Sequence, residues 1–464
     1  MNDNAAIAAI EALSNNVIET RFEDIDGKTV DMTKRRIMDV LGCSIGGACA
    51  AGNNELIKLV KDWGGKEEAS IIVHGGKVPA HNAAMLNSIM ARSFDFEALA
   101  PMVDGREHAA HISGTTVMTA ITLGEMMEID GKELISALVA GENVAIRVLV
   151  AGSFSFSEGW CDTGTINMIG ATAIAGRLLG LNNRQMRHAF GIVLSQLAGS
   201  LQNVWDSTTA FKLPQGLSAR NGIFSAQLAK AGWTGPDDML LGRFGYYHLY
   251  TEGCENPEIL TRDLGEVYFT EGVFKPYPCC RANHAAIDCA LAILEKNDVR
   301  ADDIQEVALY LSKLARDIFI AQPFRIGEFP HGNAAFNCQY TLASTLLRGK
   351  VMPEHFSEEA IRDPKIKSLT ERIRIEELPP GAPFLSARVE VKMKDGRKFS
   401  EYTDTPWGDQ LYNIMSDEEI KEKFWANVNF CGKISRDNAA EVLELIDNIE
   451  ELDSVKQMVD LVVH

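Results

Sequence analysis

The chain has 464 residues, which is too long for one ordinary hydrophobic core and predicts about two domains. Its composition, 46% hydrophobic and 23% charged, is that of a globular protein, and no apolar run approaches the roughly 18 residues of a membrane span. With 45 Lys and Arg against 64 Asp and Glu, the net charge of −19 argues against a nucleic-acid or membrane partner.

The N-terminal segment and the cysteines indicate a compartment. The first 16 residues have neither a basic segment nor an apolar segment of the kind found in secretory signals. Nine cysteines, an odd number, are scattered along the chain and do not resemble a disulfide framework. We therefore expect a cytoplasmic protein.

The first 271 residues are predicted to form helix after helix. In residues 36–48, Ile37, Val40, Leu41 and Ile45 fall on one helical stripe. Asp130 is a predicted N-cap, with Glu133 placed for the reciprocal contact. Residues 165–181 are unusually small and apolar, which predicts a central, buried helix, and residues 219–231 predict another helix.

The pattern changes near residue 272. Residues 273–280 are extended and carry two prolines, and a helix is predicted over 282–295. Strands are predicted at 306–311, 372–375, 387–393 and 398–402, with an Asp-Gly turn between the last two. Helix returns after Pro406, where Ser416 and Glu419 form a predicted capping box.

The predicted fold is mostly α. A large all-helical domain spans residues 1–271, a smaller α+β lid domain spans 272–404, and a helical tail, 405–464, packs back on the first domain. A small domain inserted late in a helical one leaves a cleft, which is a common place for an active site.

Several familiar kinds of site are missing from the sequence. The glycines at 42–47 lack the spacing and the preceding strand of a nucleotide loop, so we assign them to helix packing. Cys279, Cys280, His284 and Cys289 resemble half of a zinc site, but no second Cys/His pair accompanies them. We therefore predict no metal ligands.

The first group of candidate residues lies between 93 and 114. Asp95 stands between two phenylalanines and is either a buried structural carboxylate or a base with a shifted pKa. Arg106, His108 and His111 precede a helix start at Ser113, and a helix N-terminus suits a carboxylate substrate.

Two further groups precede predicted helices. Cys161 is either a helix-N-terminal thiolate or a small buried residue, and Thr163 follows it. Lys212, flanked by apolar residues, is either a carboxylate-binding or acid/base lysine or a surface lysine whose charged end reaches the solvent.

The last group lies at the predicted domain boundary. Lys275 and Arg281 project from a stiff segment with two prolines, and His284 follows. The alternative is a simple stiff linker. His331, in the lid, could also reach the cleft.

These motifs together resemble the MmgE/PrpD family, along nearly the whole chain. The carriers are RRIMDVLGCSIGGA (35–48), Asp-Phe-Glu (95–97), HISG (111–114), GWCDTGT (159–165), Lys212 with SARNG (218–222), and KPYPCCRANH (275–284). The resemblance implies a helical domain with a lid, a homodimer, no metal or organic cofactor, and an active site between the domains.

The resemblance also assigns site residues. Asp95, His111, Lys212 and Lys275 match active-site positions of the family. Decarboxylase-like and epimerase-like members carry a histidine where this chain has Cys161, and Gln322 stands near the place of a decarboxylase tyrosine. Both departures argue against decarboxylation of cis-aconitate.

The reactions of the family predict the chemistry. A C–H or C–C bond next to a carboxylate or imine breaks, so lysines, histidines and helix N-termini must neutralise negative charge. We expect Asp95 and His111 as the acid/base pair, with Cys161, Lys212 and Lys275 also catalytic. Arg106, His108, Thr163, Arg281 and His284 are predicted to bind a small di- or tricarboxylate. A dehydratase is favoured slightly over an isomerase or epimerase, and a non-catalytic relative is the third alternative.

Overall fold

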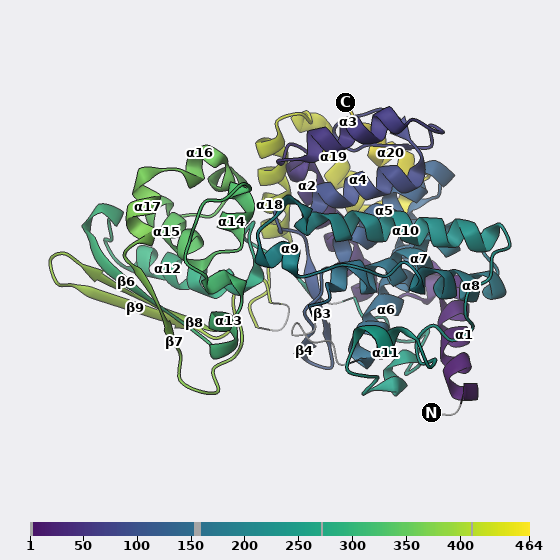
Figure 1. The fold of residues 1–464 in the computed structure, drawn as a ribbon. Coiled ribbons are helices and arrows are strands. Elements are labelled where there is room, and N and C mark those ends of the chain that lie inside the picture. The colour runs from purple at the N-terminus through teal and green to yellow at the C-terminus, as the bar shows by residue number, and fades with distance from the viewer. Residues whose placement is uncertain (1–2, 153–158, 271, 410–411) are drawn as a thin grey trace.

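The computed structural model describes residues 3–152, 159–270, 272–409 and 412–464. Figure 1 shows a large helical body beside a smaller body that is built on a sheet, and the last helices of the chain lie on the helical body. The predicted fold class is therefore confirmed: a mostly α protein with a helical domain, a smaller α+β domain and a C-terminal helical part.

Small residues let the central helices pack closely. The main helices of this body are α2 (Gly27–Gly47), α4 (Ala80–Arg92), α5 (Ser113–Met127), α6 (Gly131–Ala151), α7 (Ile166–Leu178) and α10 (Leu213–Lys230). Nearly every residue of α7 is buried. A Cβ added at Gly222 of α10 would lie 2.7 Å from the Ala171 side chain, so these two backbones touch. The prediction of a central, buried helix at 165–181 is confirmed.

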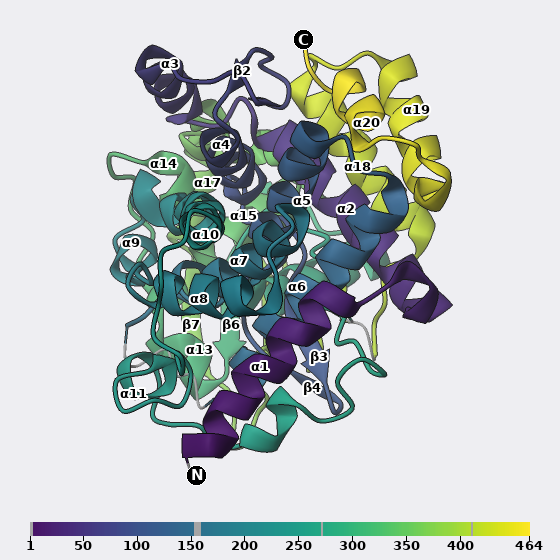
Figure 2. The same ribbon diagram turned by 90° about the vertical axis from the view of Figure 1, so that its right-hand side faces the viewer.

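The other helices of the body surround this core (Figure 2). They are α1 (Asp3–Glu19), α3 (Asn53–Trp63), α8 (Asn183–Leu194), α9 (Gln202–Trp205) and α11 (Tyr246–Tyr250). One helix, α6, is long and apolar enough to cross a membrane, contrary to our expectation that no segment would be, but its apolar window is wholly buried in the protein. Asp130 caps α6 as predicted. Glu133 pairs with Arg177 and does not make the expected reciprocal contact.

The helical body is not wholly helical, which corrects our expectation. Strand β1 (Ala69–Ser70) pairs with β2 (Lys77–Val78), and β3 (Leu99–Val103) lies between β4 (Arg106–Glu107) and β5 (Gly272–Val273). Leu99 is opposite Val273 in this second sheet. The pairing brings the segment after residue 95 beside the segment before residue 275, although 180 residues of chain separate them.

The second body is a four-stranded sheet covered by helices. The strands are β6 (Ile304–Leu311), β7 (Ile373–Glu377), β8 (Ala387–Met393) and β9 (Lys398–Thr403), in the order β7-β6-β8-β9, with only β6 and β7 parallel. Burial alternates along β8 as its sequence predicts. The helices are α12 (His284–Lys296), α13 (Lys313–Asp317), α14 (Pro330–Ala335), α15 (Cys338–Arg348), α16 (Glu358–Ile361) and α17 (Pro364–Thr370).

The tail packs on the helical body. Its helices are α18 (Asp417–Cys431), α19 (Arg436–Asp447) and α20 (Val455–Leu461), and the Ser416–Glu419 capping box begins α18 as predicted. A Cβ at Gly42 of α2 would lie 3.0 Å from the Phe424 ring of α18, and one at Gly46 would overlap Asn427. The glycines at 42–47 therefore serve helix packing, as we inferred.

Candidate active site

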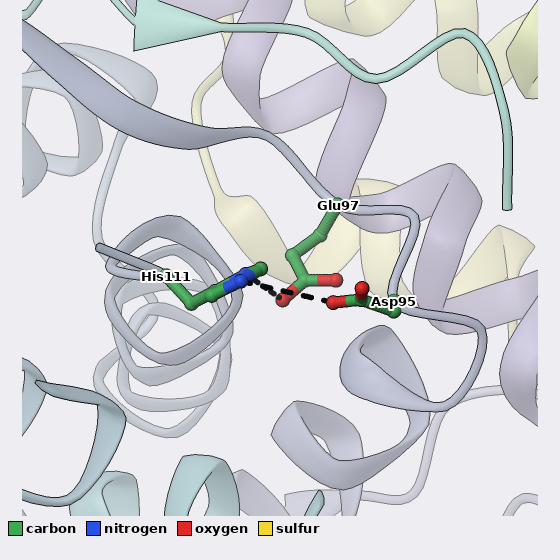
Figure 3. Close-up of side chains that lie close together, drawn as sticks. All are labelled: Asp95, Glu97 and His111. Atoms are coloured by element: carbon green, nitrogen blue, oxygen red, sulfur yellow. Dashed lines mark hydrogen bonds and ion pairs between the residues drawn. The ribbon is translucent and has the colours of Figure 1, made fainter. Parts of the chain in front are cut away.

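Three ionisable side chains of the helical body point toward one another (Figure 3). The Nδ1 atom of His111 lies 3.2 Å from Oε1 of Glu97, and its Nε2 atom lies 3.7 Å from Oδ1 of Asp95. Both carboxylates are buried, whereas 20% of the His111 side chain is exposed. A small molecule would therefore approach this group from the His111 side.

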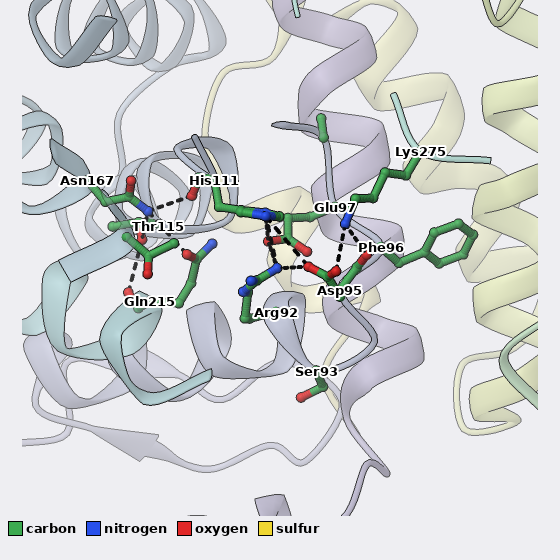
Figure 4. Close-up of polar contacts among 12 residues, drawn as sticks. Arg92, Ser93, Asp95, Phe96, Glu97, His111, Thr115, Asn167, Gln215 and Lys275 are labelled. Carbon is green, nitrogen blue, oxygen red and sulfur yellow. Dashed lines mark hydrogen bonds and ion pairs between the residues drawn. The ribbon is translucent and has the colours of Figure 1, made fainter. Parts of the chain in front are cut away.

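Two cations complete the group (Figure 4). Arg92, at the end of α4, donates hydrogen bonds to Asp95 and to Glu97. Lys275, which is fully buried, has its Nζ atom 3.0 Å from Oδ2 of Asp95 and 2.5 Å from the Asp95 carbonyl oxygen. We refer to Arg92, Asp95, Glu97, His111 and Lys275 as the charged cluster.

The cations keep both carboxylates ionised. Burial alone would raise the pKa of Asp95, but the charges of Arg92 and Lys275 outweigh it and hold that pKa well below its usual range. Burial likewise opposes ionisation of Glu97, and Arg92 and His111 lower the pKa of Glu97 overall. Asp95 is therefore a poor proton acceptor, and the structure favours its role as an orienting group over its role as a base.

The charged cluster is balanced, so its own cations do not supply the positive charge that we expected to neutralise a substrate anion. Arg92 and Lys275 are already paired with the two carboxylates. A substrate anion must therefore be bound by groups outside these ion pairs.

Asp95, Glu97 and His111 also have the residue types and spacing of a metal site, because one ligand atom from each lies within 4.8 Å of the others. However, Nη1 of Arg92 lies 3.2 Å from Glu97 Oε1 and 3.1 Å from His111 Nδ1, and also bonds Asp95. A guanidinium at hydrogen-bond distance from all three would repel a divalent cation. These residues fit a cluster of hydrogen-bonded ion pairs better than a metal site.

His111 has partners for two protonation states. Its Nδ1 atom lies near a donor, Arg92, and near an acceptor, Glu97. A bare Nδ1 accepts from Arg92, and a protonated Nδ1 donates to Glu97. In either case Nδ1 has a partner, which fixes the orientation of the ring.

The motif at 159–165 positions the His111 backbone. The Asp162 carboxylate accepts a hydrogen bond from the His111 N–H at 2.7 Å, and the Asn167 amide donates to the His111 carbonyl at 2.6 Å. Figure 4 shows Asn167, Thr115 and Gln215 grouped behind His111. The imidazole thus projects from a backbone held on both sides, just before α5 begins at Ser113.

A second buried ion pair supports the loop of Asp95 and Glu97 from behind. Lys423 of α18 donates to Asp39 of α2 at 2.5 Å and to the Phe96 carbonyl at 2.6 Å. The other oxygen of Asp39 accepts from the Ala98 N–H at 2.7 Å. Asp95 itself has φ +49°, a left-handed conformation uncommon outside glycine. The loop therefore keeps an unusual backbone because two other elements hold it.

Lys212 lies near Ser93, at the start of the loop that carries Asp95, and has no ion pair with a carboxylate among the described residues. Its Nζ atom donates to the Ala51 carbonyl and to Oδ1 of Asn53, both at 2.7 Å, and lies 3.5 Å from the Ser93 hydroxyl. Burial of the amine lowers the pKa of Lys212 to about 7. The interpretation as a solvent-reaching surface lysine is wrong, and Lys212 can give or take a proton near neutral pH.

Cys161 is a buried thiol. Its sulfur lies 2.6 Å from the Thr163 hydroxyl, and burial raises the pKa of Cys161 to about 11, with the charge of Asp162 adding to the effect. The thiolate interpretation is therefore wrong at neutral pH. Thr163 is buried as well, and its carbonyl accepts from Ser218.

Four predicted binding residues lie outside the charged cluster. Arg106 is exposed, and His108 is partly buried, with its backbone N–H bonded to the Pro101 carbonyl. Arg281 donates to the Trp407 and Pro406 carbonyls, and His284 is fully buried against the Cys279 carbonyl. Among the described residues, none of the four has a hydrogen bond or ion pair to the cluster. Arg281 and His284 therefore stabilise the segments that connect the two bodies. We do not include any of the four in the proposed site.

Sequence reasoning missed two members of the cluster. Arg92 and Glu97 flank Asp95 at three residues before and two after, and all three are charged residues in an otherwise apolar segment. Three charged residues so close together in an apolar segment are the feature of the sequence that indicates a charged cluster. We had weighed Asp95 alone.

Comparison with protein families decides the family of this chain. The model of the MmgE/PrpD N-terminal domain matches residues 11–258, and that of the MmgE/PrpD C-terminal domain matches residues 277–449. The chain belongs to the MmgE/PrpD family. The resemblance inferred from the motifs is thereby confirmed.

Curated relatives in this family are enzymes of two kinds. The chain is 23% identical to cis-aconitate decarboxylase of Homo sapiens, over 97% of this chain and 94% of the relative. It is 24% identical to cis-aconitate decarboxylase of Aspergillus terreus, over 95% and 92%. It is 21% identical to 2-methylcitrate dehydratase of Salmonella typhi, over 84% of each. The MmgE/PrpD family therefore includes enzymes named for two different reactions of small carboxylates.

Proposed function

We propose that this MmgE/PrpD protein is a lyase that removes water from a small hydroxy di- or tricarboxylate by acid/base chemistry. One observation carries the proposal: burial lowers the pKa of Lys212 to about 7, and its Nζ atom lies 3.5 Å from the hydroxyl of Ser93, two residues before Asp95 in the loop whose carboxylates also hold His111. Dehydration needs two acid/base groups, one to remove a proton from carbon and one to protonate the leaving hydroxyl.

In the proposed reaction, neutral Lys212 takes the proton from the carbon next to a substrate carboxylate. The electron pair of that C–H bond forms the carbon–carbon double bond, and the adjacent C–O bond breaks. His111 gives its Nε2 proton to the departing hydroxyl, which leaves as water. Asp95 and Glu97 hold the imidazole, and Arg92 and Lys275 hold the two carboxylates ionised.

The substrate charge suits this arrangement. The cluster itself is balanced, so a substrate polyanion would be attracted by the N-terminal end of α5, whose dipole favours anions. The same helix end would stabilise the negative charge that develops on a substrate bound there.

Decarboxylation is the competing reaction, because the names of several relatives refer to it. We favour dehydration because loss of CO₂ needs only one proton delivered to carbon, whereas Lys212 and His111 supply both an acid and a base. Cys161, protonated at neutral pH, does not replace an acid/base histidine.

The test is a panel of hydroxy di- and tricarboxylates, including 2-methylcitrate, with cis-aconitate as the decarboxylation substrate. Purified enzyme treated with a chelator is mixed with each compound, and the ultraviolet absorbance of a conjugated alkene is followed. We expect an absorbance rise with a hydroxy acid that persists after chelation and requires Lys212. Release of CO₂ from cis-aconitate, with no hydroxy acid consumed, would overturn the proposal in favour of a decarboxylase.

A further inference from the structure

The sheet body contributes a histidine that the mechanism above does not use. His331 is the second residue of α14 and is only 8% exposed. Its ring stacks on Phe329, with centroids 5.5 Å apart and planes 5° apart, and packs against Phe94 at 4.7 Å. Phe94 belongs to the loop that carries Asp95, so the imidazole is clamped between rings from both bodies.

The segment around His331 is docked closely on the helical body. A Cβ at Gly332 would lie 2.5 Å from the Phe329 ring and 3.2 Å from the Ser207 carbonyl, so glycine allows this approach. Ser207 lies in the turn just before Lys212, and Figure 1 shows α14 on the side of the sheet body that faces α9. The position of His331 relative to the Lys212 segment is therefore set by packing.

The Nε2 atom of His331 is buried and has no hydrogen-bond partner among the described residues. Buried polar atoms in native proteins are almost always hydrogen-bonded, so an atom of this kind calls for an explanation. Burial and, to a smaller extent, the charge of Lys212 lower the pKa of His331 to about 3, against the opposing effect of Asp95. The ring is thus neutral, lies within electrostatic reach of Lys212 and Asp95, and can make one further hydrogen bond.

We propose that His331 is a substrate-binding residue supplied by the sheet body, whose Nε2 atom hydrogen-bonds an oxygen of the small carboxylate held between Lys212 and the charged cluster. This inference rests on the proposed function for its substrate class. It assigns the lid a direct contact with substrate. It also explains why a polar ring lies within an aromatic cluster.

The test compares two substitutions at one position. His331→Phe keeps an aromatic ring for the stack but loses the nitrogen, and His331→Gln loses the ring but places an amide nitrogen near Nε2. His188→Phe on α8 is the matched control, because both ring nitrogens of His188 are also buried and have no hydrogen-bond partner in the part of the chain that the structure describes. Binding of tricarballylate, which has no hydroxyl to lose, is measured by calorimetry, and turnover is measured where a substrate is found.

We expect His331→Phe to fold as the wild type and to weaken tricarballylate binding and kcat/KM about tenfold or more, with His331→Gln partly restoring both and His188→Phe unchanged. Wild-type affinity in His331→Phe, or a His331→Gln variant no better than His331→Phe, would overturn the inference. Tricarballylate binding without turnover of any hydroxy acid would overturn the reaction alone. If the wild type neither binds nor reacts, both proposals fail.

Discussion

At the scale of single residues, buried charges determine what each group can do. Asp95 remains a carboxylate because the charges of Arg92 and Lys275 offset its burial. Lys212 has no ion pair with a carboxylate in the described part of the chain, and its pKa falls to about 7. The same physical effect, removal of a charge from water, gives opposite outcomes according to the neighbours. Lys212 is therefore a group of the candidate site whose pKa lies near neutral pH.

The variant Asp95→Asn separates the charge of Asp95 from its backbone. Asparagine tolerates the left-handed φ of +49°, so the substitution removes the charge and leaves Lys275 buried without a counter-charge. We expect a loss of about 3–5 kcal/mol in the free energy of unfolding, measured with urea at pH 7.

The control is the double variant Asp95→Asn with Lys275→Met, which removes both charges. It should recover much of the stability and stay inactive. An Asp95→Asn protein as stable as the wild type would contradict the ion-pair interpretation.

Lys212 also predicts a pH dependence of stability. Its pKa is about 7 in the folded protein and about 10.4 in the unfolded chain, so between these values the unfolded state binds more protons. Stability from this group is therefore lowest below pH 7 and rises as the pH increases toward 10. Relative to Lys212→Met, the wild type should gain about 2 kcal/mol of unfolding free energy between pH 7 and pH 9. Parallel stability curves for the two proteins would show that Lys212 is not deprotonated on folding.

At the scale of elements, helices distant from the site position the loop that carries Asp95 and Glu97. The Asp39–Lys423 pair joins α2, α18 and the backbone at Phe96 and Ala98. The Lys423 ammonium also lies 4.0 Å from the centre of the Phe96 ring. The tail thus supports the loop of the candidate active site and also covers the helical body.

Lys423→Met tests this support. Because the loop would lose its fixed position, we expect kcat to fall about tenfold or more in the protein that remains folded, with a smaller effect on KM. Lys423→Arg keeps the charge and should restore part of the activity. Lys421→Met is the matched control, since Lys421 lies on the same helix but pairs with Asp447 at the surface. Equal activities of the Lys421 and Lys423 variants would contradict the role of the tail.

The elements that could be predicted from sequence are those whose signal is local. The alternation of apolar and polar residues predicts β8, and a run of small residues predicts α7. Ser416 and Glu419 predict the start of α18. The short strands β3 and β5 could not be predicted, because their pairing joins segments some 170 residues apart and only tertiary packing defines it. The same pairing brings Lys275 to Asp95, a convergence that local patterns do not contain.

The site residues divide in the same way. Residue type and motif indicated Asp95, His111, Lys212 and Lys275, which the structure places in or beside the charged cluster. Arg106 and Arg281 are also cationic residues that the sequence predicts to bind a carboxylate. In the structure Arg106 is exposed, and Arg281 donates to backbone carbonyls. Whether a charge faces a neighbour, the solvent or the backbone depends on the fold and not on the local sequence.

At the scale of the whole molecule, the site joins the two bodies. The chain passes from the helical body to the sheet body near Lys275 and returns near Gly408. The Phe274 N–H donates to the Gly408 carbonyl at 3.2 Å, so these two connecting segments lie side by side. Arg281 ties the same two segments together. Because the two connecting segments lie side by side, movement of the sheet body would shift Lys275 and His331 together relative to Asp95.

The molecule also exposes large apolar side chains at several places, and three of them lie on α9 and α10. Trp205 of α9 and Leu213 and Phe224 of α10 are 48%, 40% and 47% exposed. We expect a homodimer that covers such residues, as the family resemblance implies, with a mass about twice 50.9 kDa in light scattering. A monomer at working concentration would contradict this expectation.

The central claim is that Lys212 and His111 together remove water from a hydroxy carboxylate. Proton NMR of the reaction in D₂O tests it most directly, because it distinguishes water loss, proton exchange and CO₂ loss in one sample. We predict that the wild type converts a hydroxy di- or tricarboxylate to an alkene, and that Lys212→Met forms none. Deuterium entering next to a carboxylate without loss of the hydroxyl would instead show an isomerase or epimerase and contradict the account.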